Sequence, residues 1–231
     1  MDKKIFEDAI KKFGGNVNNE QIDRFQTYSN LLISWNEKMN LTAVTDPEGI
    51  SLRHFADSVS PLYYANFPEK SKIIDIGTGA GFPGIPIKIM RPDIEITLMD
   101  SLNKRINFLK EVSEKLNLEK VECVHARAEE FSKKAEYREK YDIGISRAVA
   151  RLKVLSEYVI PFVKVGGYFI SMKAKDIEEE TEEAKEIISV LGGKIEEIKE
   201  FQIPNTDVTR KLVIIKKVKP TDKKYPRRKI K

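Results

Sequence analysis

The spacing of hydrophobic residues changes near residue 70. Before that point apolar side chains recur three or four positions apart, the period of an amphipathic helix. The first run stops at Gly14-Gly15, and the second begins with a capping-box pattern at Asn18 and Gln21. The expected helices cover about residues 5–13, 18–39 and 50–62. We therefore predict that residues 1–70 form a helical extension packed on the core that follows.

From residue 71 short β-branched runs alternate with stretches of helical spacing. The expected strands lie at 73–76, 94–99, 121–125, 141–146, 168–173, 194–201 and 210–218. The helices between them include 103–116, 152–162 and 176–191. This alternation is typical of an α/β fold with a mostly parallel sheet and helices on both faces. Residues 71–219 are thus predicted to form one Rossmann-like domain with a seven-stranded sheet.

A glycine-rich turn follows the first predicted strand. Residues 72–90 read KIIDIGTGAGFPGIPIKIM, with four glycines between Gly77 and Gly84 and an acid, Asp75, near the strand's end. Glycine allows a sharp backbone turn and close approach of a ligand, and the start of the next helix favours polar ligand groups. The pattern predicts a nucleotide-type site, the alternative being a tight turn without a ligand.

The charge of Asp75 separates the candidate cofactors. Gly79 to Gly84 matches the dinucleotide fingerprint G-x-G-x-x-G, but it begins two residues after the first glycine of the turn. A carboxylate at Asp75 would repel a pyrophosphate, whereas a cofactor with a sulfonium and an ammonium group and no phosphate suits it. D-x-G-x-G-x-G resembles motif I of the class I methyltransferases. Asp75, Gly77 and Gly79 are therefore candidate contacts to S-adenosylmethionine, and a nicotinamide oxidoreductase is a more distant alternative.

Polar residues also follow the next three predicted strands. Asp100 lies 25 residues after Asp75, where an acid binds ribose hydroxyls in such folds, although it also suits a helix N-cap. Ala128-Glu129 and Ser146-Arg147 follow the third and fourth strands. Glu129 suits either the adenine side of the cofactor or the first turn of a short helix. Arg147 is expected where a methyl acceptor approaches, with a surface salt bridge as the alternative.

Charge is uneven along the chain. The 231 residues carry a formal charge of +5, but residues 216–231 alone carry +8, which leaves −3 for the remainder. We treat residues 220–231 as a basic tail, which suits either a phosphate-rich partner or a solvated, disordered end. One cysteine, Cys123, and two distant histidines make a disulfide framework or a metal site unexpected. Without a membrane-length apolar run or a signal peptide, the sequence predicts a cytoplasmic protein.

Several short motifs together resemble one methyltransferase family. They are Trp35 with Asn40-Leu-Thr42, Arg53-His54 with Asp57-Ser58, the extended glycine motif from Gly77 to Pro86, Asp100-Ser101 with Lys104-Arg105, Arg127-Ala-Glu129 and Ser146-Arg-Ala148. This set resembles the RsmG (GidB) family over about residues 35–173. The resemblance implies a class I, S-adenosylmethionine-dependent methyltransferase that methylates N7 of guanine 527 in the 530 loop of bacterial 16S rRNA. It also implies cofactor contacts at Gly77, Phe82, Ala128, Glu129 and Arg147, with a ribose contact at Asp100.

The residues after the fourth strand agree with this chemistry. Amino-group methyltransferases usually carry Asp or Asn, two prolines and an aromatic residue there, whereas this chain has Ser146-Arg-Ala-Val149. Guanine N7 has a free lone pair and needs no deprotonation, so positioning of the reactants supplies much of the rate. Arg147 is the candidate catalytic residue, and the 30S subunit is the expected partner of a monomeric enzyme without metal. The alternative is a non-catalytic RNA-binding or ribosome-assembly factor on the same scaffold.

Overall fold

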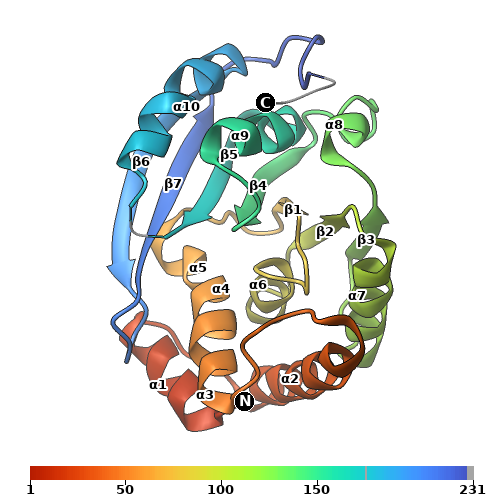
Figure 1. The fold of residues 1–231 in the computed structure, drawn as a ribbon, viewed down its shortest axis with the longest axis vertical. Coiled ribbons are helices and arrows are strands. Elements are labelled where there is room, and N and C mark those ends of the chain that lie inside the picture. The colour runs from red at the N-terminus through yellow and green to blue at the C-terminus, as the bar shows by residue number, and fades with distance from the viewer. Residues whose placement is uncertain (175, 228–231) are drawn as a thin grey trace.

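A seven-stranded sheet forms the centre of the molecule in the computed structural model, which describes residues 1–174 and 176–227 (Figure 1). The strands are β1 (Lys72–Ile76), β2 (Glu95–Asp100), β3 (Val121–His125), β4 (Tyr141–Arg147), β5 (Val163–Lys173), β6 (Gly193–Gln202) and β7 (Thr209–Lys217). Their order is β3-β2-β1-β4-β5-β7-β6, and β7 runs antiparallel to both of its neighbours while the other pairs are parallel. The predicted mostly parallel, seven-stranded α/β sheet is confirmed.

Strand β1 lies in the middle of the sheet because its side chains are apolar on both faces. Ile73 belongs to a buried cluster with the N-terminal helices, whereas Ile74 belongs to a cluster on the opposite face. Asp75 pairs in register with Leu98 of β2 and Ile145 of β4. The carboxyl ends of these strands therefore meet at one edge of the sheet, where ligands bind in open α/β folds.

Helices cover both faces of this sheet (Figure 1). The N-terminal segment comprises α1 (Lys3–Lys12), α2 (Asn19–Met39), α3 (Pro47–Gly49), the π-helical turn η1 (Ile50–Ala56), α4 (Asp57–Val59) and α5 (Pro61–Tyr64). The later helices are α6 (Gly84–Met90), α7 (Asn103–Lys115), α8 (Ala128–Phe131), α9 (Leu152–Val159), the short η2 (Ile160–Phe162) and α10 (Glu178–Val190). Helices α9 and α10 bury one face, whereas α6, α7 and the N-terminal helices bury the other. No helix in the described ranges is long and apolar enough to cross a membrane.

The N-terminal helices share a hydrophobic core with the sheet. Phe6, Phe25 and Phe55 are fully buried, and their rings contact one another at centroid distances of 4.6–6.2 Å. Tyr28 of α2 is also fully buried, and its hydroxyl donates a hydrogen bond to the carbonyl oxygen of Ala80 in the glycine turn. The helical extension is therefore a structural support for that turn.

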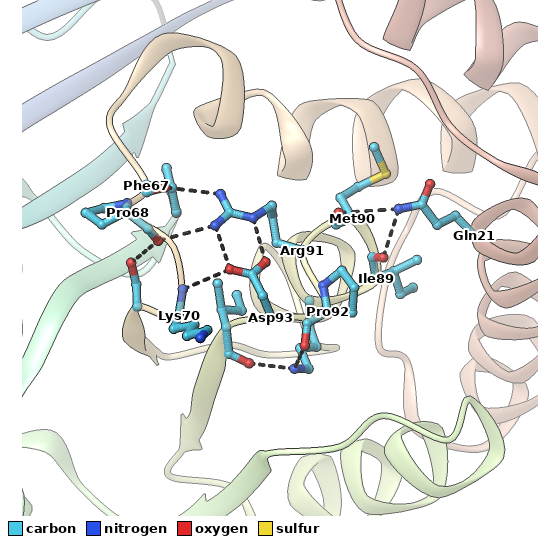
Figure 2. A network of polar contacts seen from close by, with 12 residues as sticks. Gln21, Phe67, Pro68, Lys70, Ile89, Met90, Arg91, Pro92 and Asp93 are labelled. Atoms are coloured by element: carbon cyan, nitrogen blue, oxygen red, sulfur yellow. Dashed lines mark hydrogen bonds and ion pairs between the residues drawn. The ribbon is translucent and has the colours of Figure 1, made fainter.

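Polar side chains tie the same helices to the end of α6 (Figure 2). Gln21 donates from Nε2 to the carbonyl oxygens of Ile89 and Met90, both at 3.3 Å. Arg91 pairs with Asp93 and donates to the carbonyl oxygen of Phe67 at 3.1 Å. The bonds from Gln21 satisfy two carbonyl groups that the end of α6 leaves without partners, and the bond from Arg91 ties the residue after α6 to the loop before β1.

Two elements differ from the prediction. Strand β5 begins at Val163 rather than Tyr168 because Val163 already pairs with Tyr141 of β4. The ladder then shifts register before Ile143 pairs with Tyr168, and Gly166, with φ +91°, accommodates the irregularity. Residues 220–227 do not form a free tail. They pack at the end of the sheet opposite the glycine turn, where Arg138 donates to the carbonyl oxygens of Thr221 and Tyr225. Residues 228–231 of the predicted tail lie outside the described residues.

Candidate functional site

The glycine turn after β1 is held in place by Asp75. Its Oδ2 accepts hydrogen bonds from the Thr78 hydroxyl at 2.7 Å and from the Gly84 amide at 2.9 Å. The carboxyl is fully buried, and burial raises its pKa to about 7. Asp75 was expected to contact the cofactor, but the structure places it beneath the turn, where it fixes the backbone that lines the pocket.

Gly77 occupies the point of closest approach in the turn. Its φ is +69°, and a Cβ there would lie 2.5 Å from Cγ2 of Val149. Val149 follows β4, and the residue before it, Ala148, has a left-handed φ of +56°. The glycine therefore allows the loop after β4 to close over the loop after β1.

A pocket of about 270 Å³ opens at the ends of β1, β2 and β3. Four of the predicted cofactor residues line it: Gly77, Asp100, Ala128 and Glu129. Asp100 is 3% exposed and accepts hydrogen bonds from the Gly79 amide at 3.0 Å and the Leu102 amide at 2.9 Å. Gly79 thus acts by anchoring Asp100 and does not line the pocket itself. We call this the acidic pocket.

The residues of the acidic pocket fit S-adenosylmethionine. Its lining residues include two carboxylates, from Asp100 and Glu129, and one cation, from Arg127, while Arg105 pairs with Asp100 at 3.2 Å from outside the lining. Carboxylates complement an ammonium group, a sulfonium and ribose hydroxyls. One arginine would not neutralise the charge of a pyrophosphate. Tyr158 of α9 and Met99 of β2 add apolar surface for an adenine ring. Tyr158 was not predicted, because its helix position alone gives no indication that it faces this pocket.

A second pocket, of about 360 Å³, lies at the ends of β4 and β5 and the start of β7. Its lining includes Arg53, His54, Asp57, Arg147, Met172, Lys173 and Arg210. We call it the arginine pocket. Consecutive residues after β4 line the two pockets: Arg147 and Ala148 line the arginine pocket, and Val149 lines the acidic pocket. The two pockets are therefore adjacent.

Asp57 joins two of these arginines. Its carboxyl is 2% exposed, and it accepts from Arg147 Nη1 at 3.1 Å through Oδ2 and from Arg210 Nε at 3.1 Å through Oδ1. Arg147 also donates to the carbonyl oxygen of Arg53 at 3.2 Å. Arg147 therefore forms a salt bridge, the alternative to a ligand contact, but the bridge is buried and borders a pocket.

Phe82 connects the glycine turn to the arginine pocket. His54 stacks on its ring at 4.6 Å, and Cζ of Arg147 lies 4.9 Å from the ring centroid. His54 shares a hydrogen bond of 2.7 Å between Nε2 and the Thr42 hydroxyl, and burial together with Arg147 lowers its pKa to about 4. Phe82 was expected to contact the cofactor, but it lies outside the lining of the acidic pocket, because its ring packs against these groups.

The sequence motifs Asn40-Leu-Thr42 and Arg53-His54 with Asp57 thus meet Arg147 in space. From periodicity alone His54 reads as a structural residue, and nothing local indicates a role for Asp57 or Arg210. Arg210 lies 153 residues from Asp57, and only the antiparallel insertion of β7 brings the two together. The grouping of these motifs was the available signal for the first two, whereas Arg210 had none.

Comparison with known proteins gives consistent results. A family model described as rRNA small subunit methyltransferase G (GidB) matches residues 21–213. The chain is 53% identical over 220 residues to the ribosomal RNA small subunit methyltransferase G of Desulforamulus reducens, covering 95% of this chain and 92% of the relative. It is 54% identical over 224 residues to the protein of the same name from Clostridium botulinum strain Loch Maree, covering 97% and 94%.

Solved structures share the fold at lower identity. A SAM-dependent methyltransferase from Aquifex aeolicus superposes with a TM-score of 0.55 and 20% identity, covering 79% of this chain and 97% of that one. The Methanococcus jannaschii fibrillarin pre-rRNA processing protein gives a TM-score of 0.52 and 23% identity, with 67% and 71% covered. These likenesses confirm the predicted class I methyltransferase fold.

Proposed function

The chain belongs to the rRNA small subunit methyltransferase G family, and from this membership we propose that it methylates N7 of a guanine in the 530 loop of 16S rRNA. It is an S-adenosylmethionine-dependent rRNA methyltransferase, as the family is. Our proposal concerns two features of this reaction, the position of the methylated guanine in the rRNA and the choice of N7 as the methylated atom. The assembled 30S subunit in the cytoplasm is the substrate that we propose.

The observation that carries the choice of N7 is the state of the basic and acidic groups in the arginine pocket. A methyl acceptor such as an exocyclic amine or a hydroxyl benefits from a general base, whereas guanine N7 attacks with a lone pair that is already free. Asp57 is the only carboxylate among the described residues that line this pocket. Arginine side chains donate hydrogen bonds to both of its oxygens. His54 has Nε2 bound to Thr42, and its Nδ1 is buried. The pocket therefore suits an acceptor that needs orientation rather than deprotonation.

The acidic pocket would hold the cofactor. Asp100 would accept from the ribose hydroxyls, Glu129 would bind the adenine side, and the backbone at Gly77 would lie against the methionine portion. When bound, the cofactor supplies an electrophilic methyl group on sulfur. The residues between the two pockets, Arg147 to Val149, then orient the acceptor base toward that group and exclude water, which is where the protein contributes to the rate.

The test is to identify the methylated nucleoside. Purified protein is incubated with methyl-labelled S-adenosylmethionine and 30S subunits from a strain that lacks this enzyme, and the rRNA is digested to nucleosides. We expect the label in 7-methylguanosine and in a fragment that contains the 530 loop. Label in another nucleoside would refute the choice of N7, and binding of both substrates without transfer would favour the assembly-factor alternative.

A further inference from the structure

Building on the proposed function, we propose that the arginine pocket binds the target base itself and selects guanine through O6, with Arg210 as the residue that reads O6 and Asp57 as the residue that positions Arg210 and Arg147. The ligand is thus a purine that presents a hydrogen-bond acceptor at position 6.

The lining of the pocket suits a base better than a phosphate. Apolar side chains, those of Val44, Ala148 and Met172, lie in the same pocket as the arginines. A flat heteroaromatic ring gains from apolar walls, whereas a phosphate gains nothing from them. The pocket also adjoins the acidic pocket across Ala148 and Val149, so a base placed here lies next to the methyl donor's site.

Among the described residues that line the pocket, the side-chain hydrogen-bonding groups without a protein partner are donors, apart from Nδ1 of His54, which is buried. Two nitrogens of each guanidinium have no acceptor among the described residues. They are Nη1 and Nη2 of Arg210 and Nε and Nη2 of Arg147. Lys173 is bound to the Ala150 carbonyl and to Glu180, and Asp57 is bound to both arginines. Guanine offers O6 beside N7, whereas adenine offers an amino donor there that would face a guanidinium. A donor pocket therefore favours guanine.

Arg210 is better placed than Arg147 to read O6. The side chain of Arg147 is 15% exposed and lies against Phe82. Its Nη1 donates hydrogen bonds to both Asp57 and the Arg53 carbonyl. Arg210 is 26% exposed and is held by Nε alone, so its two terminal nitrogens are available to a ligand. Asp57 fixes the position of that fork, because a carboxylate bound on both oxygens cannot turn without breaking one of the two pairs.

The experiment combines a change in the protein with a change in the base. 30S subunits are reconstituted with 16S rRNA that carries guanine, inosine or 2-aminopurine at the target position. Inosine keeps O6 and lacks the 2-amino group, whereas 2-aminopurine keeps that amino group and lacks O6. Single-turnover rates are measured for wild type, Arg210→Ala, Asp57→Asn and Asp57→Glu, with Arg151→Ala as the control for an arginine that pairs with Glu183 outside this pocket.

The wild-type protein should methylate inosine within a few-fold of guanine and 2-aminopurine at least tenfold more slowly, as expected for loss of a charged hydrogen bond. Arg210→Ala should slow methylation of guanine at least tenfold and leave the rate on 2-aminopurine unchanged. Asp57→Asn should behave in the same way, Asp57→Glu should recover part of the rate, and Arg151→Ala should match wild type.

An equal loss on guanine and 2-aminopurine in Arg210→Ala would overturn the proposal, because it would show a structural role rather than a contact to O6. Discrimination against inosine by the wild-type protein would also overturn it, because the 2-amino group would then be the feature that is read. If the wild-type protein methylates no guanine N7 at all, the proposed function fails instead, so the two failures can be told apart.

Discussion

At the scale of single residues, the carboxyl of Asp75 and the missing side chain of Gly77 decide the shape of the cofactor site. Asp75 satisfies two donors of the turn with one oxygen, while its other oxygen is buried with no partner among the described residues. Burial of that oxygen disfavours the charged form, so the residue has an ordinary pKa when unfolded and a raised one when folded.

Asp75→Asn should therefore change how stability depends on pH. The native pKa of about 7 lies above the ordinary 3.8, so the native state binds the proton more tightly, and stability falls as pH rises between those values. Between pH 5 and pH 7 the free energy of unfolding of the wild type should fall by roughly 1–3 kcal/mol relative to that of Asp75→Asn. Both are measured by urea unfolding without cofactor. Arg91 lowers the pKa of Asp93, so Asp93 is ionised throughout this range. Asp93→Asn is therefore a control that should leave the pH dependence of stability between pH 5 and pH 7 unchanged. Parallel profiles for wild type and Asp75→Asn would contradict the assignment.

Gly77→Ala tests the close contact between the two loops. Both Gly77 and Gly166 have positive φ, but a Cβ at Gly166 meets nothing within 4 Å, whereas one at Gly77 meets Val149. Each substitution should cost about 1 kcal/mol of backbone strain. Gly77→Ala should in addition weaken S-adenosylmethionine binding at least tenfold in calorimetric titration, and Gly166→Ala should not. Equal affinities for the two variants would remove Gly77 from the cofactor site.

At the scale of elements, the C-terminal segment supports helix α9. Glu157 of α9 is fully buried, and its carboxylate accepts from the guanidinium and the backbone amide of Arg227. The next residue, Tyr158, lines the acidic pocket. Residues 220–227 thus stabilise the helix that forms one wall of that pocket, and whether the basic segment also touches RNA remains a prediction.

Arg227→Ala should destabilise the protein by roughly 1–3 kcal/mol, because a buried carboxylate loses its charged partner. Lys223→Ala removes an equal charge from an exposed residue of the same segment and should leave the midpoint of thermal unfolding unchanged. If the two variants unfold at the same temperature, the segment does not hold α9. Binding to 30S subunits at several salt concentrations, measured on the same variants, reports any separate contact to phosphates.

At the scale of the whole molecule, local pattern could predict the sheet but not the acceptor pocket. Hydrophobic period and the glycine turn place β1 to β4 and the cofactor residues at their ends, because each signal lies within a few residues of the element that it describes. Asp57 and Arg210 meet across the sheet through the antiparallel position of β7, which no local spacing encodes. The packed position of residues 220–227 depends on burial of Glu157 in another helix, whereas their charge alone suggested either a phosphate-binding tail or a solvated end.

We expect methyl transfer to take place at the end of β4, between the acidic pocket and the arginine pocket. The most direct test is single-turnover methylation of 30S subunits from a strain that lacks the enzyme, with binding to the subunit measured in parallel, for wild type and Arg147→Ala. An interaction that matters most in the transition state affects turnover more than binding, so Arg147→Ala should reduce the rate at least a hundredfold and the affinity only a few-fold. A wild-type rate in Arg147→Ala would place the chemistry elsewhere and leave Arg147 as a structural salt bridge to Asp57.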